Sequence, residues 1–265
     1  MSTEIHPSSV VSERARIGEN VTIGPFCVVE DDVEIGNGTT LMSHVVLGNG
    51  TRLGSEVRVH PGAVIGTAPQ DLKFGGEKTY AFVGDRTVVR ECATINLGTS
   101  ATGETRVGAD CLLMAYTHVA HDCVLGDHVI MANSVNLGGH VEVGDWAIIG
   151  GVSGVHQFVR VGAHAMLGGL SKATQDVPPY TLAGRSPLVV EGLNIVGLRR
   201  RGFDQLQLNA IQEFYNDLYK KGLNVSDALK RYEDEHAEIH PLVAEIIAFI
   251  RASKRGICRW NHGRS

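Results

Sequence analysis

The stretch "IGENVTIGPFCVVEDDVEIGNGTTLMSHVVLGNGTRLGSEVRVHPGAVIG", residues 17–66, is built from a repeated six-residue unit. An aliphatic residue opens each unit, at positions 17, 23, 29, 35, 41, 47, 53, 59 and 65, and glycine or another small residue tends to follow it. The same phase includes Ile5 and Val11, and it returns from Val83 to Leu167. Repeats of this length are typical of a parallel β-helix, in which three six-residue units make one triangular coil.

The positions within the unit have distinct expected roles. The first residue should point inward and stack on its equivalent one coil away, and the glycine after it should permit the turn. The fifth position carries further inward residues, among them Cys27, Cys111 and Cys123, so we expect these thiols to pack in the core rather than react. The chain has 5 cysteines without paired spacing, which favours a reducing compartment over a disulfide framework.

Two interruptions preserve the phase of the repeat. Ile65 and Val83 are separated by three whole units, and Ile95 and Val107 by two whole units. The intervening segments, about 69–82 and 98–106, are therefore predicted to be loops that leave a continuous coil.

The repeat fades after Pro179, and from about Leu188 apolar residues recur at the three- and four-residue spacing of helices. The sequence predicts a mainly β fold, with a β-helix at residues 1–187 and a small helical domain at 188–265. We expect the polar tail from Trp260 onward to be loose.

Composition excludes several classes of function. The net charge of -5 and the lack of a long basic run argue against nucleic acid as a partner. The sequence contains no apolar run of membrane-spanning length and no N-terminal apolar signal region, so we expect a cytoplasmic protein without stable membrane insertion.

Polar residues converge on one part of the coil. Adjacent coils are about 4.8 Å apart, and residues separated by one full coil, or three units, lie in one column. His121, Gly139 and Gln157 share a column, and Asp122 and His140 share the neighbouring one. We therefore expect these five residues to cluster. The other histidines of this region, His128, His156 and His164, lie in other columns and are expected to be structural.

Two chemistries fit this cluster. In the first, His118, His121 and His140 bind zinc, as in the carbonic anhydrases of the hexapeptide fold. In the second, an imidazole takes a proton from a hydroxyl, a carboxylate fixes its tautomer, and a backbone N–H stabilises the oxyanion. His121 beside Asp122, with Gly139 one coil away, fits the second scheme better.

Six motifs together resemble one family. They are "DLK" at 71–73, "HVAHDC" at 118–123, "GGHVEV" at 138–143, "VHQFVRVGAH" at 155–164, "QDVPPY" at 175–180 and "GLRRRGF" at 197–203. Essentially the whole chain is similar to the acyl-(acyl-carrier-protein)–UDP-N-acetylglucosamine O-acyltransferases of lipid A synthesis. The resemblance implies a homotrimer of left-handed parallel β-helices with active sites between subunits. It implies that an (R)-3-hydroxyacyl group moves from the phosphopantetheine of acyl carrier protein to the 3-hydroxyl of UDP-N-acetylglucosamine, without a metal or cofactor.

The resemblance also implies residue roles. His121 would be the general base, Asp122 its orienting partner and Gly139 the oxyanion donor. Gly169 falls at the position of the family's acyl-chain ruler, the residue near the far end of the groove that sets the length of the acyl chain. The implied substrate contacts are Asp71 and Lys73 on the first loop, His118, His140 and Gln157 near sugar and thioester, and Asn194, Arg200 and Arg201 on the nucleotide and carrier-protein side.

Two departures leave the acceptor open. Many members have Glu where this chain has Val196, and His-Arg where it has Asn96-Leu97. Both places are near substrate in the family, so a 3-hydroxyl and a 3-amino sugar are both retained as acceptors. A zinc hydratase is retained as the alternative from another class, and it predicts stoichiometric metal. A purely structural β-helix subunit predicts that His121→Ala leaves the biological role intact.

Overall fold

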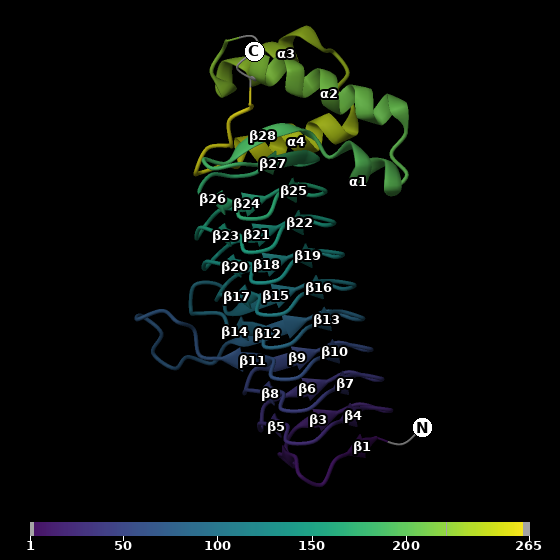
Figure 1. Ribbon diagram of the computed structural model, residues 1–265. Helices are drawn as coiled ribbons and strands as arrows, with labels where there is room; N and C mark the ends of the chain where they lie inside the picture. Colours follow the sequence, from purple (N-terminus) through teal and green to yellow (C-terminus); the bar gives the residue numbers. More distant parts are fainter. Residues whose placement is uncertain (1–2, 221, 262–265) are drawn as a thin grey trace.

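A computed structural model describes residues 3–220 and 222–261, which form a column of stacked triangular coils capped by helices (Figure 1). In this part of the chain, three sheets make the sides of a left-handed parallel β-helix, and each coil contributes one strand to each sheet. The strands of the coils pair in parallel with the equivalent strand of the next coil, as in the register His118↔Asn136 and Asn136↔Gly154. The predicted spacing of three six-residue units between coils is confirmed.

The strands of each sheet, in spatial order, are as follows. Sheet A contains β1 (Glu4–Ile5), β4 (Thr22–Ile23), β7 (Thr40–Leu41), β10 (Arg58–Val59), β13 (Val88–Val89), β16 (Leu112–Leu113), β19 (Ile130–Met131), β22 (Ile148–Ile149), β25 (Met166–Leu167), β27 (Thr181–Gly184) and β28 (Val189–Leu193). Sheet B contains β2 (Val10–Val11), β5 (Val28–Val29), β8 (Val46–Leu47), β11 (Val64–Thr67), β14 (Thr94–Asn96), β17 (His118–Val119), β20 (Asn136–Leu137), β23 (Gly154–Val155) and β26 (Lys172–Ala173). Sheet C contains β24 (Arg160–Val161), β21 (Glu142–Val143), β18 (Val124–Leu125), β15 (Glu104–Val107), β12 (Tyr80–Val83), β9 (Thr51–Leu53), β6 (Glu34–Ile35) and β3 (Arg16–Ile17).

The interior of the column is the predicted aliphatic stack. The second residue of each short strand points inward, so Leu113 and Val119 are fully buried. Cys27, Cys111 and Cys123 are buried as well, which confirms their packing role. Burial raises the pKa of the Cys111 thiol to about 11 and that of Cys123 to about 12, so both stay protonated.

For most of the repeated glycines the expected role, permitting the turn, is wrong; Gly66, which follows Ile65 where the first loop begins, is an exception with a φ of 83°. Gly36 and Gly108, which follow the inward aliphatic residue, do not have positive φ. A Cβ at Gly36 would lie 2.4 Å from the backbone of Gly54 in the next coil, so the glycine permits close stacking of coils. The left-handed backbone conformation is found two residues after the glycine position, at non-glycine residues such as Asp122 (φ 60°) and His140 (φ 60°).

The turns lie at the three long edges of the column. Edge A holds the turns that follow sheet A, such as residues 168–170. Edge B holds those that follow sheet B, such as residues 138–140, and edge C those that follow sheet C, such as residues 144–146. Going around the column, sheet A therefore lies between edges C and A, and edge B lies opposite it.

Both loops occur where the repeat is interrupted, but they are shorter than expected. The first lies between Thr67 and Tyr80, and it projects from the column near β11 and β14 (Figure 1). The second lies between Asn96 and Glu104. The expected loop ends at 82 and 106 were wrong because β12 and β15 pair over four residues, from Tyr80↔Glu104 to Val83↔Val107.

The helical domain begins later than the expected boundary at 188. β27 and β28 form an antiparallel pair that extends sheet A to Leu193. The helices that follow are α1 (Ile195–Arg200), α2 (Gln205–Lys220), α3 (Val225–Glu235) and α4 (Pro241–Arg251). None of the described helices combines the length and apolar character needed to cross a bilayer.

The segment after α4 returns to the column. Ile257 forms a bridge with Asp176, and the Trp260 ring packs 5.1 Å from Tyr219 and 5.8 Å from Tyr215. The expectation of a loose tail from Trp260 is therefore wrong for Trp260 itself. Its large ring packs against the hydrophobic core of the coils and also against the separate hydrophobic core of the helices. Residues 262–265 lie outside the described part of the chain.

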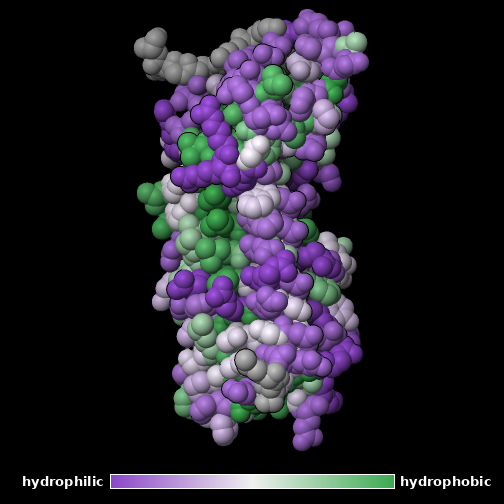
Figure 2. Space-filling model, turned by 90° about the vertical axis from the view of Figure 1, so that its right-hand side faces the viewer, coloured by the Kyte–Doolittle hydropathy of each residue, from purple (hydrophilic) through white to green (hydrophobic). Residues whose placement is uncertain are grey.

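The outer face of sheet A is apolar on the upper coils. The first residue of each strand points outward there, giving the half-buried series Leu112, Ile130, Ile148 and Met166. Figure 2 shows a band of apolar surface below the helical cap, which gives way to a more polar surface on the lower coils. A contiguous apolar face of this kind marks a contact or binding surface.

Candidate active site

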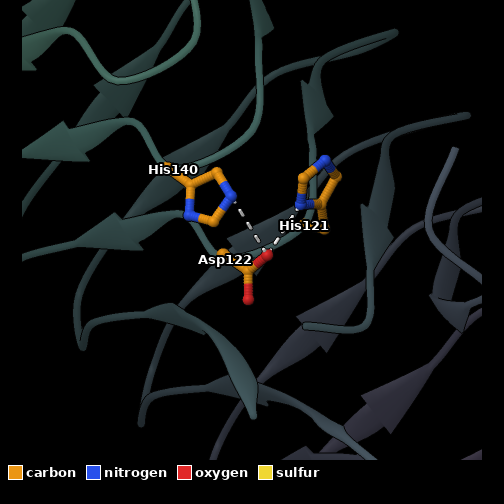
Figure 3. A group of neighbouring side chains, drawn as sticks. All are labelled: His121, Asp122 and His140. Atoms are coloured by element: carbon orange, nitrogen blue, oxygen red, sulfur yellow. Dashed lines mark hydrogen bonds and ion pairs between the residues drawn. The ribbon is translucent and has the colours of Figure 1, made fainter. Parts of the chain in front are cut away.

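Three side chains meet at edge B, from two successive coils (Figure 3). His121 and Asp122 follow β17, and His140 follows β20 one coil further on. Asp122 Oδ2 lies 2.7 Å from His121 Nδ1 and 3.5 Å from His140 Nε2, between the two rings. The ring centroids are 5.2 Å apart and the rings are perpendicular. The convergence expected from the spacing of the coils is present for these residues.

Asp122 is buried and its carboxylate is fully engaged. It accepts hydrogen bonds from the Thr99 N–H (2.9 Å), the Thr99 hydroxyl (2.7 Å) and the Thr102 hydroxyl, besides that from His121. Burial acts to raise the pKa of Asp122, but the hydrogen bonds from Thr102, His121 and Thr99 outweigh it and lower the pKa to about 2. The carboxylate therefore stays ionised and holds the His121 Nδ1–H, which leaves Nε2 as the free basic nitrogen.

Thr99 and Thr102 were missed by the sequence reasoning. Both lie on the second loop, which was considered only as an excursion from the coil. The path of a loop cannot be derived from the six-residue period, so the available signal was the presence of three hydroxyl residues, Thr99, Ser100 and Thr102, between β14 and β15.

Gly139 lies directly against the His121 imidazole. A Cβ at this position would lie 2.5 Å from His121 Cε1 and 2.6 Å from Nε2, so the imidazole fits only beside a glycine. Within residues 3–220 and 222–261, no acceptor receives a hydrogen bond from the Gly139 N–H. An unpaired backbone N–H beside a base is the donor that a developing oxyanion requires.

His118 and Gln157 flank this centre. His118 Nδ1 lies 2.7 Å from Thr94 Oγ1, and burial, followed by the charge of His121, lowers the pKa of His118. His118 thus remains neutral, as a hydrogen-bonding group rather than a second cation. Gln157 is exposed on the turn one coil above Gly139.

Phe158, which the sequence reasoning also missed, stacks on His140 with centroids 4.5 Å apart and an interplanar angle of 10°. Phe158 follows His140 by one full coil and lies in the same column, so the repeat alone could have predicted that it lies beside His140. A cavity of about 710 Å³ opens beside these rings, lined also by Arg160, Lys254 and Arg255.

The donor set does not fit the zinc alternative. Among the described residues, the donor atoms close enough to hold an ion, within 4.8 Å of one another, belong to His121, Asp122 and His140, so His118 is not a member of the expected three-imidazole set. Both Asp122 oxygens already accept hydrogen bonds from Thr99 and Thr102. A metal would have to displace these bonds, whereas an acid–base pair uses the arrangement as it stands.

The remaining predicted residues lie at other places on the column. Asn194 caps α1, accepting from the Gly197 N–H and donating to His164 O, and Arg201 at the end of α1 contacts His164 and Trp146, all at edge C. Arg200 is exposed on α1. Within one chain, Asn194, Arg200 and Arg201 are therefore separate from the cluster at edge B.

Two further parts of the predicted site are also separate from the cluster. Gly169 lies in a turn of edge A. Asp71 and Lys73 lie on the first loop, where Asp71 Oδ1 accepts from the Lys73 N–H at 3.0 Å. The predicted site is thus divided among three edges and a loop of one chain.

Family models match both parts of the chain. A model described as UDP N-acetylglucosamine O-acyltransferase, domain 2, matches residues 176–258. A model described as bacterial transferase hexapeptide (six repeats) matches residues 32–67 and 104–139.

Curated relatives and solved structures match almost the full length. Proteins named acyl-(acyl-carrier-protein)–UDP-N-acetylglucosamine O-acyltransferase from Thiobacillus denitrificans and Verminephrobacter eiseniae are each 44% identical, covering 96% and 97% of this chain and 99% and 100% of their own. The crystal structure of a UDP-N-acetylglucosamine acyltransferase from Bacteroides fragilis has a TM-score of 0.93 at 44% identity, covering 96% of this chain and 100% of that one. A homologous structure from Acinetobacter baumannii has a TM-score of 0.93 at 39% identity, covering 96% and 99%.

Proposed function

The chain belongs to the family of acyl-(acyl-carrier-protein)–UDP-N-acetylglucosamine O-acyltransferases, and from this membership we propose its reaction and the residues that perform it. The enzyme transfers an (R)-3-hydroxyacyl group from acyl carrier protein to the 3-hydroxyl of UDP-N-acetylglucosamine, the first step of lipid A biosynthesis. The observation that carries the assignment of the site is the buried, ionised Asp122 holding His121 Nδ1 while Nε2 stays free.

The reaction proceeds by general base catalysis. His121 Nε2 takes the proton of the sugar 3-hydroxyl, and the hydroxyl oxygen attacks the thioester carbonyl. The Gly139 N–H donates a hydrogen bond to the resulting oxyanion, and Asp122 stabilises the imidazolium. When the C–S bond breaks, the imidazolium returns the proton to the phosphopantetheine thiolate.

The positions of the other residues support a homotrimer with shared sites. Edge B carries the base, whereas sheet A lies between edge C, with Arg201, and edge A, with Gly169. Packing edge B of one subunit against the sheet A side of its neighbour brings base, nucleotide contacts and acyl-chain ruler into one cleft. The apolar outer face of sheet A then lines the path of the acyl chain.

No metal or cofactor enters this scheme, because the acyl group arrives on the carrier protein's phosphopantetheine. Transfer should therefore continue in the presence of a strong chelator, whereas a zinc hydratase would lose its activity. An acyl carrier protein as donor implies a cytoplasmic enzyme.

The test is an acyl-transfer assay with hydroxyacyl carrier proteins of several lengths, using UDP-N-acetylglucosamine and its 3-amino analogue as acceptors and mass spectrometry to identify products. We expect transfer to the 3-hydroxyl sugar and a loss of at least about 1,000-fold in His121→Ala, with the fold intact. Transfer by His121→Ala near the parent rate would remove His121 from its role. Preference for the amino sugar would identify the other acceptor.

The shared site has its own test. Neither His121→Ala nor Arg201→Ala should be active alone at low substrate concentration. Co-expressed subunits of the two variants should regain activity, because one interface then combines an intact edge B with an intact edge C. If the mixed oligomers stay as inactive as the separate variants, each site belongs to one subunit.

A further inference from the structure

Aromatic rings from successive coils stack along edge C. His128, Trp146 and His164 follow one another at intervals of one full coil, and each has the left-handed φ of the turn (58°, 61° and 58°). The ring centroids of His128 and Trp146 are 3.9 Å apart, with an interplanar angle of 19°. Those of Trp146 and His164 are 6.3 Å apart, with an interplanar angle of 6°. The indole is thus held nearly parallel between two imidazoles, which restricts its rotation.

Arg201 rests on this stack. Its guanidinium carbon lies 5.3 Å from the centroid of the Trp146 ring, within the range of a cation–π interaction. Its Nη1 lies 3.4 Å from His164 Nδ1. Burial, followed by the charge of Arg201, lowers the pKa of His164 to about 4, so His164 is neutral near pH 7 and does not repel the guanidinium.

Arg201 has no anionic partner in the described chain. No described carboxylate lies within ion-pair distance of it, whereas Arg86, Arg160 and Arg185 each pair with one. A half-buried guanidinium without a counterion is costly unless a ligand supplies the anion. The ring compensates part of that cost from one side and leaves N–H donors unpaired for oxygens of a ligand.

We propose that Trp146, clamped by His128 and His164, is a positioning residue that holds the Arg201 guanidinium in place for the diphosphate of the nucleotide sugar. This inference rests on the proposed function for the identity of the nucleotide. Trp146 itself touches the arginine rather than the reacting atoms, so it acts on acceptor binding and not on proton transfer. The 37% exposure of Trp146 distinguishes it from a core ring such as Phe214, which is 1% exposed.

The first test is a kinetic comparison. Asparagine tolerates left-handed φ, so Trp146→Asn removes the ring with little backbone strain. We expect the KM for UDP-N-acetylglucosamine to rise about tenfold, while kcat and the KM for the acyl donor stay within about twofold. Trp146→Phe, which keeps an aromatic face, should restore most of the loss. In an Arg201→Ala background, Trp146→Asn should raise KM no further.

A matched control exists at the opposite end of the column. Phe26 is an exposed ring at a turn with φ 60°, its ring centroid lies 5.1 Å from that of His44, and no arginine of the described residues lies over it. Phe26→Asn should leave every kinetic constant unchanged. A KM within twofold of the parent in Trp146→Asn, or an equal rise in Phe26→Asn, would overturn the proposal.

The second test is independent of acyl transfer. The chain has 2 tryptophans, so Trp260→Phe leaves Trp146 as the sole indole fluorophore. UDP alone should change the emission of that variant with saturation, and Arg201→Ala in the same background should lose the change. If no acyl donor gives product but UDP still changes the emission, the proposed function fails while the positioning role stands. If transfer occurs and the emission is insensitive to saturating UDP, the positioning role fails.

Discussion

At the scale of single residues, the contact between Gly139 and His121 is tight enough for a methyl group to disrupt it. In Gly139→Ala the new Cβ would displace the imidazole, because it would lie 2.5 Å from Cε1. We expect acyl transfer to fall at least about 100-fold, with the melting temperature little changed. The matched control is Gly154→Ala on β23, where a Cβ meets nothing within 4 Å, and it should keep full activity. Equal activities in the two variants would contradict the placement of His121.

Asp122 links catalysis to stability at low pH. Its pKa of about 2 lies below the ordinary value of 3.8, so the carboxylate stabilises the fold above about pH 4 and this stabilisation is lost as the pH falls toward 2. The contribution near neutrality is about 2 kcal/mol.

Asp122→Asn is therefore expected to lower the free energy of unfolding by about 2 kcal/mol at pH 7 and to flatten its pH dependence between pH 4 and 2. Transfer should fall at least about 100-fold, because the amide no longer fixes the His121 tautomer. Denaturant titrations across this pH range test the first point. A variant with the parent's acid sensitivity would show that another carboxylate governs it.

Residue-level prediction succeeded where the backbone is periodic. His121, Asp122 and His140 could be brought together from the sequence because parallel register returns every side chain to its column after one full coil. Thr99 and Thr102 could not, since the path of a loop depends on its own contacts. The role of the glycines was misjudged because close stacking involves atoms of two coils, which a pattern along one strand does not contain.

At the scale of elements, the Asn194 side chain caps the N-terminus of α1. The Asn194 side chain accepts from the Gly197 N–H and donates to His164 O, tying the helix that carries Arg200 to edge C. Asn194→Ala should destabilise the protein by about 1 kcal/mol and raise the KM for UDP-N-acetylglucosamine several-fold.

The control for this prediction is Asn224→Ala. Asn224 caps α3 in the same way, with its side-chain oxygen accepting a hydrogen bond from the Asp227 N–H, but α3 carries none of the proposed site. It should cost similar stability and leave KM unchanged. If both variants change KM alike, α1 has no special role in acceptor binding.

Element boundaries were the least predictable feature. β12 and β15 each extend to four residues because they pair with each other beside the loops. β28 adds an antiparallel strand on top of sheet A, although its sequence has left the hexapeptide phase. These elements form through partners far along the chain, and periodicity does not report such partners.

At the scale of the whole molecule, stability should vary along the column. The inward Ile5 of the first coil is 44% exposed, whereas Leu113 in the middle is fully buried. Ile5→Ala should cost less than about 1 kcal/mol of unfolding free energy, and Leu113→Ala about 2–5 kcal/mol. Amide hydrogen exchange should be fastest in β1 to β3. Equal protection of the amides from exchange in all coils would contradict a stack in which each coil is stabilised only by its direct neighbours.

The parallel register also limits which insertions and deletions this chain can inherit. Arg58 pairs with Val88 and Val88 with Leu112, so these two coils are longer than the others, yet the same edges resume because the extra residues bulge out as loops. A gene duplication of one full coil would lengthen the molecule and leave every later side chain on its own edge. Inserting a single six-residue unit within the coils would instead rotate everything downstream by one edge, carrying Arg201 from edge C to edge A. Lineages of this protein should therefore differ in length by whole coils or at the loops.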